Sequence, residues 1–111
     1  MSLSKTIREA LLPMGFPVAN QVYTGTETTY IVFSRYNEGA ALVADDKEQE
    51  TRFSIQVSAF GKGDIENLIK EVKTRLEAIG FVRNSYFEAY EKDTKLYHKA
   101  YRFYYDNKIG E

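Results

Sequence analysis

The chain has 111 residues, no cysteine, and 15 lysine and arginine residues against 16 aspartate and glutamate residues, for a net charge of −1. This length predicts one domain over residues 1–111, able to bury a core without disulfides or metal, and the missing thiols exclude cysteine nucleophiles and thiolate metal sites. A nearly neutral chain has no overall field that attracts DNA, RNA or an anionic membrane, so any such binding must be local. No stretch of about eighteen apolar residues occurs, and we therefore expect a soluble chain with no contact to a membrane.

The first predicted element is a helix within the opening dozen residues. Ser2 or Ser4 can cap its start, and Pro13 and Gly15 end it. Its apolar residues recur at spacings of three and four, as expected for one helical face: Leu3, Ile7, Ala10 and Leu11.

Three strands and a polar tip are predicted next. Residues 21–25 and 28–36 are rich in β-branched and aromatic side chains, and the polar break between them predicts a hairpin turn. Residues 40–44 predict a short apolar strand after the break at 37–39. The segment "DDKEQE" (45–50) is polar enough to predict an exposed tip.

The middle of the chain carries the clearest patterns. In "TRFSIQVSAF" (51–60) apolar and polar residues alternate strictly, which predicts a half-buried strand. Residues 64–79 carry a broad apolar stripe at helical spacing, with Asp64 or Gly63 as the expected cap and Gly80 just past the end.

A second hairpin closes the chain. Residues 81–90 and 95–105 flank the polar turn at 91–94 and predict two long paired strands. The predicted order is α-β-β-β-β-α-β-β. The predicted fold class is α+β, an antiparallel sheet with two helices packed on it.

The stretch "YEKDTKLYHKAYRFYY" (90–105) is unusual because aromatic and charged side chains share both faces of its strand. Tyr97 and Lys99 lie on one face, and His98, Arg102 and Tyr104 lie on the other. Such a strand either carries a bulge or is covered by its own core on one side and by something else on the other.

Catalytic, metal and cofactor sites are not indicated. His98 is the chain's single histidine, and no serine or aspartate stands in a nucleophile signature that would use it. The acidic residues of 45–50 lack the glycine and ligand ladder of a calcium loop, and "FGKGD" (60–64) lacks the spacing of a phosphate loop. We expect no enzymatic activity, no cofactor and no small-molecule substrate.

Single-stranded nucleic acid is an alternative ligand for the closing hairpin, because cations interleave with tyrosines there. Neighbouring acidic residues and the near-zero net charge count against it, and tyrosine and arginine are also enriched at protein interfaces. The residues concerned are Lys92, Lys95, Tyr97, Lys99, Tyr101, Arg102 and Tyr104.

Long segments of the chain resemble a known family. The run from "IREALLPMGF" through "VADDKE" and the closing "YEKDTKLYHKAYRFYY" resemble the small tail-completion proteins of long-tailed bacteriophages and prophages of Gram-positive bacteria, also described as tail terminators or tail-to-head joining proteins. The resemblance extends nearly end to end and contains no short diagnostic motif. A minor tail or tail-assembly protein of the same gene cluster is the neighbouring alternative.

The resemblance implies a structural protein of the virion tail, assembled in the host cytoplasm. Its implied partners are other copies of itself in a ring, commonly six, the tail-tube protein and the head-connector protein, with DNA passing through the ring without specific binding. A ring joins two different patches, so the acidic tip and the basic hairpin are candidates for the interface, although the tip can instead line the lumen. The candidate interface residues are Asp45, Asp46, Glu48, Lys95, Tyr97, His98, Arg102 and Tyr104.

Overall fold

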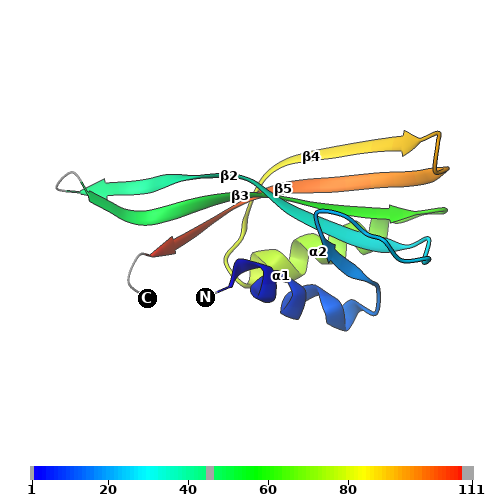
Figure 1. The fold of residues 1–111 in the computed structure, drawn as a ribbon, viewed down its shortest axis with the longest axis horizontal. Helices are drawn as coiled ribbons and strands as arrows, with labels where there is room; N and C mark the ends of the chain where they lie inside the picture. The colour runs from blue at the N-terminus through cyan, green and yellow to red at the C-terminus, as the bar shows by residue number, and fades with distance from the viewer. Residues whose placement is uncertain (1, 45–46, 109–111) are drawn as a thin grey trace.

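The computed structural model describes residues 2–44 and 47–108 as two helices on one face of a five-stranded sheet (Figure 1). The strand order is β1-β2-β3-β5-β4. The elements in chain order are α1 (Leu3–Leu11), a 3-10 turn (Leu12–Met14), β1 (Val18–Asn20), β2 (Tyr30–Ala44), β3 (Lys47–Gly61), α2 (Glu66–Ala78), β4 (Val82–Glu91) and β5 (Leu96–Lys108).

The predicted α+β class is confirmed, with one correction to the sheet. The order of elements is α-β-β-β-α-β-β, one strand fewer than expected. Three pairings, β2 with β3, β3 with β5 and β4 with β5, are antiparallel, but β1 runs parallel to β2, so the sheet is mixed.

The predicted hairpin between residues 21–25 and 28–36 is wrong. Residues 21–25 form a loop, and the partner of β2 at this margin is Val18–Asn20. The loop turns away at Gln21, whose φ is 70°, and Tyr23 folds back so that its ring stacks on Tyr30 with 4.3 Å between centroids. The Tyr23 hydroxyl also accepts a hydrogen bond from the Glu27 amide, at 2.9 Å, so the side chain organises the loop that the β-rich composition had predicted as a strand.

The two predicted strands 28–36 and 40–44 are one bulged strand. The residues between them stay in the ladder, where Asn37 pairs with Ser54 and Gly39 with Arg52. Register shifts after Arg35 and after Ala40 absorb the irregularity. Of the predicted tip, Lys47–Glu50 belong to β3, while Asp45 and Asp46 lie outside the described residues.

Helix ends follow the predicted signals. Ser2 caps α1 by accepting the Lys5 amide at 3.2 Å, and the Asp64 carboxylate accepts the Glu66 amide at 2.9 Å just before α2. Gly80, with φ of 103°, ends α2 with a Schellman motif, in which the Gly80 amide donates to Glu77 and the Phe81 amide to Leu76. The motif turns the chain from α2 into β4. No helix in the part of the chain that the structure describes is long and apolar enough to cross a membrane.

The core lies between the helices and the middle of the sheet. Ile55, Val57 and Ala59 of β3 are fully buried, as their alternation predicted, and they belong to one apolar cluster with the stripe of α2. Beyond this core, β2 and β3 continue together past the helices, which gives the molecule extents of 51 × 24 × 24 Å (Figure 1). Much of the sheet therefore has no helix over it.

Placing a carboxylate in this core is expected to unfold the domain. Ile55→Asp or Leu76→Asp puts an unpaired charge at a fully buried position, which costs several kcal/mol against a total stability of roughly 5–15 kcal/mol. Thermal melting followed by circular dichroism measures the effect. Thr74→Asp, on the exposed side of the same helix, is the matched control and should melt close to the parent; a cooperative, parent-like melt of Leu76→Asp would contradict the placement of this core.

Candidate interaction surfaces

The face of the sheet opposite the helices, here called the open face, carries a row of aromatic rings that crosses the strands. Tyr30 of β2 stacks on Phe60 of β3 at 4.9 Å, and Phe60 stacks on His98 of β5 at 4.3 Å. Tyr23 extends the row at one end, and Phe87 of β4 meets His98 edge-on at 5.3 Å at the other. Cross-strand pairing produces the row, because Tyr30, Phe60 and His98 are successive partners in the ladder.

His98 is more enclosed than a surface histidine. Its side chain is 14% exposed, and Nδ1 lies 3.4 Å from a Glu91 carboxylate oxygen. Nε2 is buried without a hydrogen-bond partner among the described residues. Burial lowers the pKa of His98 below its ordinary value, while the nearby Glu91 carboxylate opposes this shift. The neutral imidazole is therefore favoured, and it serves as one of the rings of the row.

Two shallow hollows flank His98 on the open face. One is lined by the rings of Tyr23, Tyr30 and Phe60 together with Ser58, and the other by Phe87, Ser85 and Arg102; Gln56 and His98 line both. The polar groups around them are hydroxyls, amides and single charges. Among residues 2–44 and 47–108, no group of three or more histidine, cysteine or acidic residues is placed to hold a metal ion.

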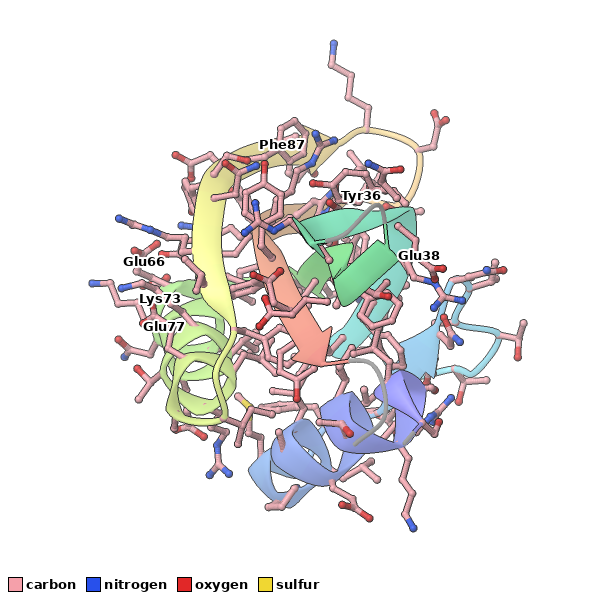
Figure 2. The ribbon with its side chains drawn as sticks, turned by 90° about the vertical axis from the view of Figure 1, so that its left-hand side faces the viewer. Tyr36, Glu38, Glu66, Lys73, Glu77 and Phe87 are labelled. Carbon is pink, nitrogen blue, oxygen red and sulfur yellow. The ribbon has the colours of Figure 1, made fainter. Side chains whose placement is uncertain are left out.

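Arginine and tyrosine side chains occupy the rest of the open face. The Arg102 guanidinium lies 4.9 Å from the centroid of Tyr36, and its Nε donates to Gln56 Oε1 at 3.1 Å. Arg52 lies 5.0 Å from the Tyr104 ring. Figure 2 shows Tyr36 and Phe87 on the side of the sheet away from the helices.

Arg52 is also the anchor of a bidentate ion pair. It donates through Nε and Nη2 to the two carboxylate oxygens of Asp106, at 2.8 and 3.0 Å, across the β3–β5 pair. The Arg52 guanidinium holds the pKa of Asp106 below its usual value. The pair fixes these neighbouring strands where helices no longer cover them.

The helix side of the β4–β5 hairpin carries a second set of charges and rings. Lys99 is paired with Glu66 of α2 and with Glu88 of β4, the latter at 3.4 Å. The hydrogen bond to Glu66 raises the pKa of Lys99 and lowers that of Glu66. Tyr97 lies beside Tyr90 with 4.9 Å between centroids, and both rings are half-exposed.

The predicted interface residues are divided between these surfaces. His98, Arg102 and Tyr104 lie on the open face, and Tyr97 lies on the helix side. Lys95 occupies the exposed β4–β5 turn with φ of 59°. Glu48 lies in β3 near the opposite end of the molecule, and Asp45 and Asp46 lie outside the described residues.

The cations and tyrosines weighed as a nucleic-acid surface do not form one surface. Lys99 and the buried Tyr101 are on the helix side, whereas Arg102 and Tyr104 are on the open face. Lys99 and Arg102 are also engaged with Glu66 and Gln56 respectively. A single strand running along one face of the hairpin would meet only part of this set.

Strand β4 is an exposed edge that the sequence analysis did not single out. Its residues 82–90 are all exposed, including Val82, Tyr86, Phe87 and Tyr90. In the sequence, residues 81–90 carry aromatic side chains on both faces of the predicted strand. That pattern predicts a strand, but it does not show that the strand lies at the edge of the sheet. Only the strand order shows that nothing in the described chain lies beyond it.

Comparison with known proteins supports the fold. No family model matches the chain. No curated protein matches its sequence. Among solved structures, a chain from the "Virion of native gene transfer agent (GTA) particle" superimposes with a TM-score of 0.63 and 14% sequence identity, covering 95% of this chain and 93% of the other. At this identity the match shows a shared fold, and the shared fold extends over nearly the whole of both chains.

Enclosure of His98 predicts that stability depends on pH below about 6.5, the ordinary pKa of histidine. A histidine whose pKa is lowered by folding is protonated more readily in the unfolded chain than in the folded one. The free energy of unfolding should therefore be greatest above the unfolded-state pKa of about 6.5 and should decrease as the pH falls below that value. His98 is the chain's single histidine, and the carboxyl groups of Glu66 and Asp106, whose pKa values are lowered, act at more acidic pH.

Urea denaturation at a series of pH values tests this expectation, with His98→Phe as the comparison variant. Phenylalanine retains a ring to stack on Phe60 and removes the titrating group. The variant should lose the part of the pH dependence that sets in just below pH 6.5. An equal slope in both proteins would assign it to other groups.

Proposed function

We propose that this chain is a structural protein of a phage-type virion, which caps the tail tube as a ring of about six copies and joins the tail to the head. The observation that supports it most is the fold shared over 95% of the chain with a component of a gene transfer agent virion. The resemblance of its sequence to tail-completion proteins supports the same role. In this proposal the chain acts without catalysis or a cofactor, and DNA passes through the ring without specific binding.

The shape of the molecule fits a subunit that contacts neighbours at both of its ends. The end of the β2–β3 hairpin and the β4–β5 turn lie at opposite ends of the long axis (Figure 1). A charged contact between neighbours would then join the acidic segment at Asp45, Asp46 and Glu48 to the turn at Lys95. Arg102 contributes less to this contact, because it is already stacked on Tyr36 and bonded to Gln56.

Deleting the gene tests the proposed role. The expected result is particles with heads and tails that fail to join, or tails of abnormal length, seen by negative-stain electron microscopy, with restoration by the gene supplied in trans. Mass spectrometry of purified particles should find the chain in joined virions and in isolated tails. Normal infectious virions from the deletion strain would refute the proposal, and a chain found only in cell lysate would favour an assembly factor.

Charge reversal tests the contact between the two ends. Asp45→Lys with Asp46→Lys should lower the yield of joined particles, and adding Lys95→Glu with Arg102→Glu should restore part of it. Each exposed pair contributes only about 0.2–1 kcal/mol, but the contact repeats around a ring. Lys5→Glu, an exposed change on α1 away from both ends of the sheet, is the control. Full yield from the doubly reversed acidic variant would remove the charged contact from the proposal.

A further inference from the structure

Strand β4 presents an unpaired backbone edge along its whole length. It is the last strand of the sheet and pairs only with β5 among the described residues. Its ten residues contain no proline, and its side chains from 82 to 90 are exposed. One register shift lies between Arg83 and Ser85, and residues 85–91 pair regularly with β5. An edge of this kind is a template for another strand, and proteins that leave edges free usually shorten them or protect them with proline, bulges or inward charges.

Apolar side chains flank this edge on both faces of the sheet. Tyr86 and Tyr90 project on the helix side, with 40% and 50% of their surface exposed, and Phe87 projects on the open face, with 50% exposed. A partner lying on one face would cover only one of these groups. An added strand covers both and also pairs the backbone, so the chemistry of this margin fits a β-strand as its occupant.

The opposite margin of the same sheet offers an edge of matching length. Strand β1 pairs with Ile31–Phe33 alone, so residues 34–44 of β2 have a strand partner on the β3 side only, within the described chain. This stretch of β2 and the whole of β4 are nearly equal in length. Register shifts after Arg35, Ala40 and Leu42 leave residues 37–40 as the regular part of the β2 edge. Figure 2 shows Phe87 of β4 and Glu38 of β2 on different margins of the sheet.

We propose that β4 of one copy pairs antiparallel with β2 of a second copy, beyond the end of β1. The inference rests on the proposed function, since it names a contact through which the ring would close, as an alternative to the charged contact between the two ends of the molecule. Successive antiparallel pairings make β2 and β4 run in opposite directions. Within one copy Asn37 is level with Val82, through Ser54 and Tyr104, so pairing Asn37 with Ala89 of a neighbour shifts successive copies along the strands. A ring built this way closes with its strands tilted to the ring axis, as in a barrel, and the second copy continues the sheet with its helices on the same side. Because two different edges meet, each copy keeps one edge for the next, as a ring requires.

The faces of the two edges agree in this arrangement. Pairing residues 86–89 of β4 with residues 37–40 of β2, between the register shifts of the two strands, places Ala89 opposite Asn37 and Phe87 opposite Gly39. All four lie on the open face, since their partners within the sheet are His98, Ser54, Ala100 and Arg52. A Cβ at Gly39 would meet nothing within 4 Å, so the surface beside the Phe87 ring is open there.

The same alignment brings Glu88 toward Glu38 on the helix side, where the two like charges would weaken the contact if they were bare. Each already has a cation of its own: Lys99 lies 3.4 Å from Glu88, and Arg35 lies 3.2 Å from Glu38.

Disulfide trapping tests the contact, because the chain has no cysteine of its own. The full-length Ala89→Cys/Asn37→Cys variant is oxidised at its highest soluble concentration and separated on non-reducing gels. Within one copy the two positions are three strand spacings apart across the sheet, about 14 Å, and seven residues apart along it, roughly 23 Å. That is too far for a disulfide, so any link joins two molecules. The expected result is a ladder of linked oligomers. A mixture of the two single variants should stop at dimers, with the linked peptides identified by mass spectrometry.

Matched variants define what would overturn the proposal. The Ala89→Cys/Glu38→Cys variant carries its thiols on opposite faces of the sheet and should form several-fold fewer disulfides. The Ala89→Cys/Gly39→Cys variant tests a register shifted by two residues, and disulfide formation in it would support the same contact. Linking no greater than in the opposite-face control, for both registers, would overturn the pairing. Efficient linking of Ala89→Cys alone would replace it with a two-fold β4–β4 contact and would also overturn it.

The outcomes separate the contact from the proposed function. If β2–β4 disulfides form but the protein is absent from purified particles, the contact is supported and the proposed tail role is refuted. If the protein is required for joined virions but no β2–β4 disulfides form, the proposed role is supported and the proposed contact is refuted.

Discussion

The burial of α2 and α1 against the middle of β3 is the contact on which the other features of this molecule depend. Ile55, Val57 and Ala59 are fully enclosed there. At about 25 cal/mol per Å² of buried apolar surface, such side chains supply the main favourable free energy of a domain of this size. The two helices are short compared with the 15-residue strands they cover, so the same core that stabilises the domain leaves the open face, both margins and the far hairpin without cover.

Those uncovered parts are stabilised locally by pairs of side chains across strands. The aromatic row through Tyr30, Phe60 and His98 and the arginine contacts of Arg52 and Arg102 lie on the open face. Offset ring contacts contribute about 0.5–1.5 kcal/mol each beyond their burial. They stiffen the face of the sheet that no helix covers, and they leave a surface rich in rings and guanidinium groups, the composition that protein interfaces favour.

A subunit of an assembly is a coherent explanation of this distribution. The hollows beside His98 are shallow and lined by rings, hydroxyls and amides together with Glu91 and Arg102. Exposed apolar side chains gather along the edge strand β4, at Val82, Tyr86, Phe87 and Tyr90, and Tyr36 adds another on the open face. The proposed tail role and the proposed pairing of edges both follow from that distribution, and each can fail without the other.

The sequence by itself determined the helices, the alternation of 51–60, the closing hairpin and the caps at Ser2 and Gly80, because each depends on side chains within a few residues of one another. It also placed His98, Arg102 and Tyr104 on a common face. The tertiary structure decided that Tyr23 stacks on Tyr30 where a strand was expected, that Val18–Asn20 pairs parallel with β2, and that β4 ends the sheet. These outcomes depend on partners distant in the chain: neighbour order in a sheet is a long-range choice, and alternation along one strand carries no information about which strand, if any, lies beside it.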